Sequence, residues 1–258
     1  MNASNPIVLM YHAIKSARAS FPMEREVGAE LYDVSHQDFN QQMEFLKSNN
    51  YSVMTLEDQS MDQASPSVII TFDDGEMNNI EWAFPMLKEY QFPAYFFVTV
   101  NRVGKKGYMG WEQLLELRDS GMILGSHGLN HEIMTNLKEK EIERELVDSK
   151  EILEQHLKIE LKYFSVPRGF CDTRIIALAK QCGYRNIFVS GMQKDSDPFC
   201  VDRIAVKGDW TLERFTQALK QKIPFQEKFS DWGKNLGKGV LGVKRYDQLR
   251  TMLLKRKK

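Results

Sequence analysis

The stretch Ser67–Gly75 reads SVIITFDDG and decides the fold class. Its first six residues are mostly β-branched or apolar and follow Pro66, a composition typical of a buried strand. The strand runs directly into two carboxylates, Asp73 and Asp74, before Gly75 ends it. Functional side chains in parallel α/β folds gather at the carboxyl ends of strands, so we predict that these aspartates border a site.

Similar short apolar runs alternate with segments of helical period along the rest of the chain. We predict strands over 7–11, 67–72, 94–100, 122–126, 163–166, 186–190 and 204–206. We predict helices over 35–49, 78–90, 111–120, 138–157, 173–182 and 212–222, with Pro85 kinking or dividing the second of them. The alternation indicates an α/β fold in which seven or eight parallel strands close most simply into a barrel. The competing topology is an open doubly wound sheet, but its nucleotide-binding glycine fingerprint follows none of the predicted strands.

Composition and charge bound the class of protein. The 258-residue chain is 42% apolar and 27% charged, which excludes a disordered or fibrous protein. It has 35 basic and 35 acidic residues, so we expect no nucleic-acid partner. Residues 228–258 differ, with ten basic and two acidic side chains, and we therefore divide the chain into a barrel, 1–227, and a basic tail, 228–258, that is partly helical. The tail is either a solvated charged end or a surface that docks on an anionic membrane or a lipid-linked phosphate.

Cysteines and the N-terminus indicate the compartment. Cys171, Cys182 and Cys200 have no CxxC spacing, so we expect reduced thiols rather than a disulfide scaffold or a zinc knuckle. Apolar runs are all shorter than a bilayer span, and the first residues lack the basic and apolar regions of a signal peptide. The sequence as written thus predicts a cytoplasmic protein, while export stays open for a chain whose leader has been removed.

Three further predicted strand ends carry polar groups. His127 and His131 follow strand 122–126, His12 follows strand 7–11, and Arg168 follows strand 163–166. Two histidines and one carboxylate are a common set for a divalent cation with open positions. Each motif alone also has a plain structural interpretation; an aspartate after a strand, for example, often caps the next helix.

These residues resemble the successive motifs of NodB-type polysaccharide deacetylases, carbohydrate esterase family four. The resemblance is carried by TFDDG at 71–75, SHGLNH at 126–131 and PRG at 167–169, and it spans roughly residues 6–215. It implies a distorted (β/α)7 barrel and a metal-dependent enzyme that removes N- or O-acetyl groups from an acetylated sugar. The rival hypotheses are an inactive deacetylase-fold protein that only binds glycan, and a scaffolding subunit whose basic tail recruits a partner.

The resemblance also implies roles for individual residues. Asp73 would be the general base, and Asp74, His127 and His131 would bind the metal, most simply zinc, with cobalt or nickel as alternatives. The opening Met-Tyr-His at 10–12 resembles the branch that deacetylates poly-N-acetylglucosamine, in which His12 would be the general acid. No histidine follows His156, which agrees with that branch.

Two positions depart from the family pattern. Arg168 stands between Pro167 and Gly169, where it would pair with Asp73, contact substrate or lie at the rim. Arg203, within Asp-Arg-Ile at 202–204, is predicted to contact the residues of the site rather than the cation itself. The expected substrate is an acetylated glycan or a lipid-linked sugar.

Overall fold

The computed structural model describes residues 6–23, 25–58, 65–190 and 197–220. Its strands are β1 (Ile7–Tyr11), β2 (Ile14–Lys15), β3 (Val34–Ser35), β4 (Ser52–Val53), β5 (Ser67–Phe72), β6 (Tyr95–Val98), β7 (Ile123–Ser126), β8 (Tyr163–Ser165), β9 (Asn186–Ser190) and β10 (Cys200–Ala205). Its α-helices are α1 (His36–Ser48), α2 (Phe84–Tyr90), α3 (Trp111–Asp119), α4 (Glu139–Leu157), α5 (Thr173–Gln181) and α6 (Leu212–Leu219). The basic tail predicted at 228–258 lies outside the described residues.

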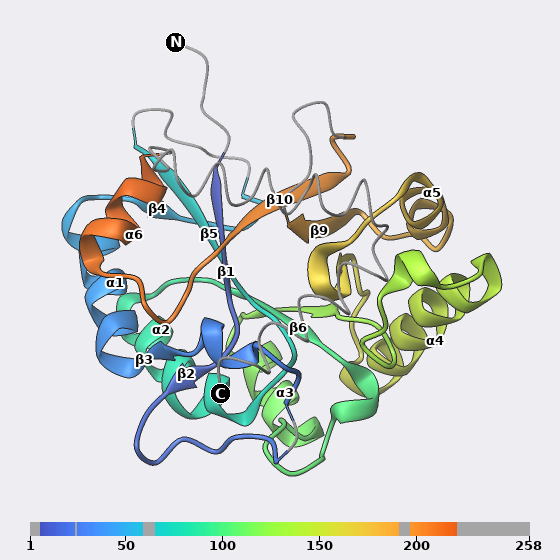
Figure 1. Ribbon diagram of the computed structural model, residues 1–258, viewed down its shortest axis with the longest axis horizontal. Helices are drawn as coiled ribbons and strands as arrows, with labels where there is room; N and C mark the ends of the chain where they lie inside the picture. Colours follow the sequence, from blue (N-terminus) through green and yellow to red (C-terminus); the bar gives the residue numbers. More distant parts are fainter. Residues whose placement is uncertain (1–5, 24, 59–64, 191–196, 221–258) are drawn as a thin grey trace.

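Seven parallel strands close into a barrel within the described part of the chain. Their order is β1-β10-β9-β8-β7-β6-β5, and β1 closes the ring because it pairs with both β10 and β5. Helices α1, α2 and α6 gather on one side of the strands, and α4 and α5 on the other (Figure 1). The distorted (β/α)7 barrel is therefore confirmed, and the open doubly wound sheet is excluded.

The interior of the barrel is divided into an apolar half and a polar half. Near the amino ends of the strands, buried side chains form a separate cluster of Val8, Met54, Ile69, Tyr95, Phe97, Tyr163 and Phe188. Gly125 makes room for this cluster, since a Cβ there would lie 2.5 Å from the ring of Phe97. Because apolar side chains fill this half, the polar residues at the carboxyl ends are held at one mouth of the barrel.

Most predicted elements are present, with two informative differences. The predicted helix 78–90 is a π-helical turn, Asn79–Ala83, followed by α2, with Pro85 in the first turn of α2. This division agrees with the expected effect of that proline. The strand predicted at 204–206 was placed wrongly, because β10 begins at Cys200 and includes Arg203.

Two other expectations concern the whole chain. All three cysteines are free. Among the residues that the structure describes, none of the helices combines the length and apolar character of a membrane span.

Candidate metal and catalytic site

The polar mouth of the barrel is built from strand ends that lie far apart in the sequence. β1 leads into His12, β5 into Asp73 and Asp74, and β7 into His127. Because all these strands are parallel, their carboxyl ends meet at the same edge. The backbone of β1 and β5 stays paired to the end, since Asp73 N–H donates to the carbonyl of Tyr11 at 3.0 Å.

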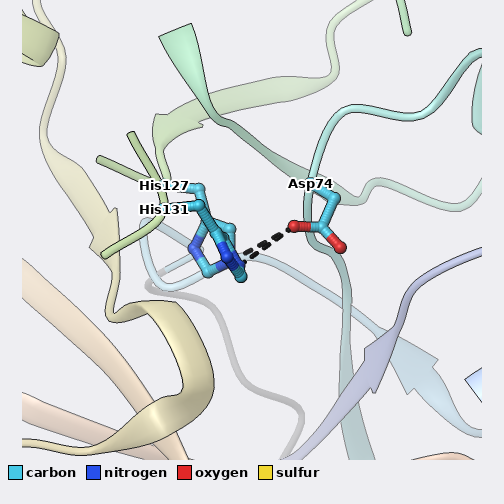
Figure 2. Close-up of side chains that lie close together, drawn as sticks. All are labelled: Asp74, His127 and His131. Carbon is cyan, nitrogen blue, oxygen red and sulfur yellow. Dashed lines mark ion pairs between the residues drawn. The ribbon is translucent and has the colours of Figure 1, made fainter. Parts of the chain in front are cut away.

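Asp74, His127 and His131 converge at this mouth (Figure 2). Oδ1 of Asp74 lies 3.2 Å from Nε2 of His131 and 3.8 Å from Nε2 of His127. One ligand atom from each residue can be chosen so that all three lie within 4.8 Å of one another. A carboxylate oxygen and two imidazole nitrogens at such separations form a donor set that could hold a divalent cation.

Unusual backbone conformations turn these ligands inward. Asp74 and His131 have positive φ angles of 74° and 62°. Non-glycine residues rarely adopt this region, and aspartate tolerates it better than most. The turn after Asp73 sends the two adjacent carboxylates to different partners, as expected for separate roles.

The second histidine lies on a loop that a buried glutamate shapes. Glu145, on α4, accepts hydrogen bonds from the backbone N–H of Leu129 at 2.7 Å and of Asn130 at 3.0 Å, and from the Asn130 amide at 2.6 Å. Gly128 has φ +80°, and a Cβ there would lie 2.9 Å from Oε2 of Glu145. The loop between the two histidines therefore requires both a glycine and this carboxylate.

The other nitrogen of each imidazole faces an oxygen atom. Nδ1 of His127 lies 2.8 Å from the carbonyl of Ser165, which fits an Nδ1–H donor and leaves the Nε2 lone pair directed at the site. Nδ1 of His131 is in close contact with Oε1 of Glu26, although this contact does not have the geometry of a regular hydrogen bond. Burial lowers the pKa of His127 to about 4 despite the nearby Asp73, so its imidazole is neutral at ordinary pH. Metal-binding histidines are neutral and oriented in this way.

Asp73 is held by a buried arginine. Nη1 and Nη2 of Arg203 donate to Oδ1 and Oδ2 of Asp73, both at 2.8 Å, and the hydroxyl of Ser165 donates to Oδ2 at 3.2 Å. Burial alone would raise the pKa of Asp73, but the Arg203 guanidinium outweighs it and holds that pKa well below its usual range. Asp73 is therefore an ionised hydrogen-bond acceptor at the mouth.

His12 has a buried nitrogen that is available for chemistry. Its Nδ1 has no hydrogen-bond partner among the described residues, and its ring lies against that of Tyr32 with the centroids 5.0 Å apart. Burial lowers the pKa of His12, while the nearby Asp74 and Asp73 act in the opposite direction. A half-buried imidazole with a buried, unsatisfied nitrogen beside two carboxylates is suited to proton transfer.

Arg168 does not pair with Asp73, which binds Arg203 instead. Its Nη1 lies 2.6 Å from Oε2 of Glu26. This contact places Arg168 at the rim of the site, which is one of the three alternatives given above for this residue.

Four contributors were not predicted from the sequence: Glu26, Arg102, Glu145 and Ser165. Arg102 donates to Oδ1 of Asp74 at 2.9 Å. Ser165 had a usable signal, since it lies in the predicted strand 163–166, two residues before Pro167. The other three lie in a loop, a short turn and a helix whose local patterns do not indicate a site.

Comparisons with known proteins find polysaccharide deacetylases as relatives. A family model described as "Polysaccharide deacetylase" matches residues 60–187. A peptidoglycan-N-acetylglucosamine deacetylase of Bacillus cereus is 29% identical over 131 residues, 50% of this chain and 59% of that protein. A poly-beta-1,6-N-acetyl-D-glucosamine N-deacetylase of Staphylococcus aureus is 24% identical, covering 87% of this chain and 85% of that protein. The structure of the Streptococcus pyogenes deacetylase PplD in complex with acetate superposes with a TM-score of 0.72 at 22% identity, over 83% of this chain and 97% of that one.

The extent of the matches differs among relatives. The chain spans 59% of the length of the Bacillus cereus protein and 62% of a related Bacillus subtilis protein.

Proposed function

Because the chain belongs to the polysaccharide deacetylase family, we propose that it is a metal-dependent hydrolase that removes N-acetyl groups from a glycan containing N-acetylglucosamine. The observation that carries this proposal is the convergence of Asp74, His127 and His131 at one mouth of the barrel, beside Asp73 and His12. The names of the Staphylococcus aureus and Bacillus cereus relatives support N-acetylglucosamine as the sugar.

Asp74, His127 and His131 are the proposed ligands of the cation, with zinc as the expected ion and cobalt or nickel as alternatives. When bound, such a cation supplies Lewis-acid chemistry: it lowers the pKa of a water molecule to roughly 7 and polarises a carbonyl oxygen. The outer contacts to Ser165 and Glu26 suit this role, because they leave Nε2 of each histidine directed at the site.

Asp73 is the proposed general base. Arg203 keeps it ionised and fixes both oxygens, so the carboxylate accepts a proton without rearranging. The same ion pair makes Asp73 a weak base, because it stabilises the charged form. Asp73 can therefore accept a proton readily only from a water whose own pKa has been lowered, which agrees with a base placed beside a cation site.

His12 is the proposed general acid. An amine anion is too poor a leaving group to depart unaided from the acetylated sugar, so a proton must reach the nitrogen as the amide bond breaks. Nδ1 of His12 is buried and unpartnered; burial lowers the pKa of His12, but Asp74 and Asp73 oppose this shift and favour the protonated form. The products would be acetate and a glucosaminyl unit.

The rival hypothesis of an inactive glycan-binding protein requires that part of this machinery be missing. Instead, the two carboxylates and three imidazoles that the proposed reaction uses are all present, four of them in the turns after β5 and β7. The scaffolding alternative leaves this set without an explanation.

Acetate release from N-acetylglucosamine oligomers, measured together with metal content, tests the proposal. We expect zinc-dependent release by the wild type, and loss of both zinc and activity in Asp74→Asn. An oligomer-binding protein that releases no acetate when loaded with zinc, cobalt or nickel would instead be the inactive alternative.

A further inference from the structure

Glu26 is a carboxylate at the site that the proposed reaction does not use. It lies in the connection between β2 and the 3-10 turn Ala29–Tyr32, and its side chain is 36% exposed. Three side chains from separate parts of the chain converge on it: His131, Arg102 and Arg168. Such a network holds a partly exposed carboxylate more firmly than an isolated surface ion pair would.

The contact with His131 connects Glu26 to the cation site. Oε1 of Glu26 contacts Nδ1 of the imidazole, while Nε2 of the same ring lies 3.2 Å from Oδ1 of Asp74. A carboxylate beside Nδ1 favours the tautomer that carries its proton there. That tautomer leaves the Nε2 lone pair free to bind a cation.

The two arginines fix Glu26 in this position. Nη1 of Arg168 lies 2.6 Å from Oε2, and Nη2 of Arg102 lies 3.1 Å from Oε1. The neighbouring Arg25 anchors the backbone, because it pairs with Asp33 at 2.7 Å and with Glu76 at 2.9 Å. The loop therefore presents Glu26 to His131 with little freedom to move away.

The two histidines differ in the charge of their outer partner. His127 contacts a neutral backbone carbonyl, that of Ser165, whereas His131 contacts a carboxylate. A negative partner makes an imidazole a stronger donor to a cation. We propose that Glu26 is a positioning residue that sets the tautomer of His131 and strengthens cation binding. This inference rests on the proposed function only because it requires a cation at Asp74, His127 and His131.

Zinc affinity is the first test, measured on the full chain by competition with a chromophoric chelator. We expect Glu26→Gln, which keeps the shape and removes the charge, to bind zinc roughly 10–100-fold more weakly than the wild type. The matched control is Glu132→Gln, which removes a charge from an exposed residue adjacent to His131 in sequence. The control should bind zinc as the wild type does.

The tautomer of His131 is the second test, because a purely structural role for Glu26 would not change it. Nitrogen-15 NMR of the metal-free protein, at a pH where the imidazoles are neutral, should show a larger share of the Nδ1–H form of His131 in the wild type than in Glu26→Gln, because Asp74 faces Nε2 in both proteins. In Glu26→Gln the Nε2–H form should become more populated. His127 is an internal control, since its contact with the Ser165 carbonyl is retained.

The outcomes separate this inference from the proposed function. If Glu26→Gln binds zinc as tightly as Glu132→Gln, or if its His131 keeps the wild-type tautomer, the inference is wrong. If the wild type binds no divalent cation, it is the proposed function that fails. Should Glu26→Gln not fold, Arg168→Gln releases Oε2 of Glu26 and should weaken zinc binding several-fold; unchanged affinity there would also overturn the inference.

Discussion

Asp73 and Asp74 are adjacent in sequence but bind different partners. The positive φ of Asp74 turns the chain, so Asp73 pairs with Arg203 while Asp74 lies nearest to His131; Nε2 of His127 lies between the two carboxylates, 3.9 Å from Asp73 and 3.8 Å from Asp74. Two carboxylates side by side would repel each other at a buried strand end. Here each has its own positive or hydrogen-bonding neighbours, which makes the pair tolerable and gives each member a separate role.

His12 should be required for turnover but not for cation binding. We expect His12→Ala to lower turnover by about 10²–10⁴, the usual contribution of a general acid, while zinc content stays at the wild-type level. His156→Ala is the control, because that imidazole stacks on Trp111 and lies outside the site. A His12→Ala variant with wild-type acetate release would remove His12 from the mechanism.

The buried pair of Arg203 and Asp73 should make stability depend on pH. Because the folded-state pKa of Asp73 is lowered, its contribution is present above the unfolded value of about 4 and is lost as pH falls through the folded value. We expect Arg203→Met to reduce the free energy of unfolding by about 3–5 kcal/mol at pH 7, and by less at pH 3. Urea unfolding at both pH values measures the difference.

An exposed pair on α4 provides the control for that experiment. Arg144 and Asp148 are four residues apart with side chains 74% and 41% exposed, so Arg144→Met should cost less than about 1 kcal/mol. The importance of the buried pair would be contradicted if Arg203→Met and Arg144→Met reduced the free energy of unfolding equally. It would also be contradicted if the loss in Arg203→Met were as large at pH 3 as at pH 7.

At the scale of elements, the sequence predicts the parts of the site that follow strands and misses those that reach it from elsewhere. Strands β1, β5 and β7 are continuous apolar runs, so their ends, and with them His12, Asp73 and His127, can be located from pattern alone. β10 is different: only Cys200 and Arg203 of its six residues are buried, and the inward-facing Arg203 interrupts the apolar pattern. Glu26 and Glu145 reach the site through contacts distant in sequence, which a local pattern cannot indicate.

Helix α4 shapes the loop that carries both histidines, so we expect Glu145 to affect stability and cation binding together. Glu145→Gln replaces one acceptor oxygen by a donor and leaves backbone N–H groups of residues 129–130 without a full set of partners. The expected cost is about 1–3 kcal/mol in unfolding free energy, with weaker zinc binding. Thermal unfolding of the metal-free protein and zinc titration measure the two effects.

Glu143→Gln is the matched control on the same helix, because Glu143 is exposed. It should leave both quantities unchanged. If Glu145→Gln behaves like Glu143→Gln, the loop holds its conformation without this carboxylate.

At the scale of the whole molecule, the apolar half of the barrel supports the polar half. Ring closure through β1 brings β5 and β10 to either side of the same strand, which is why Asp73 meets Arg203 across the mouth. Beneath this pair, the guanidinium of Arg203 lies over the rings of Phe97 and Phe188, with centroid distances of 5.7 and 5.9 Å. The aromatic cluster therefore fills the barrel and also limits where Arg203 can lie.

Phe188→Ala should test this connection between core and site. Its ring is fully buried, so we expect a loss of about 3–5 kcal/mol in unfolding free energy, whereas Leu212→Ala, at a side chain 38% exposed, should change it by less than about 0.5 kcal/mol. The substitution would leave a cavity beneath Arg203, so we expect acetate release to fall. Zinc affinity depends on the ligands that follow β5 and β7 and should stay near that of the wild type. If folded Phe188→Ala protein keeps full activity, the aromatic cluster contributes to stability alone and Arg203 is positioned by its hydrogen bonds.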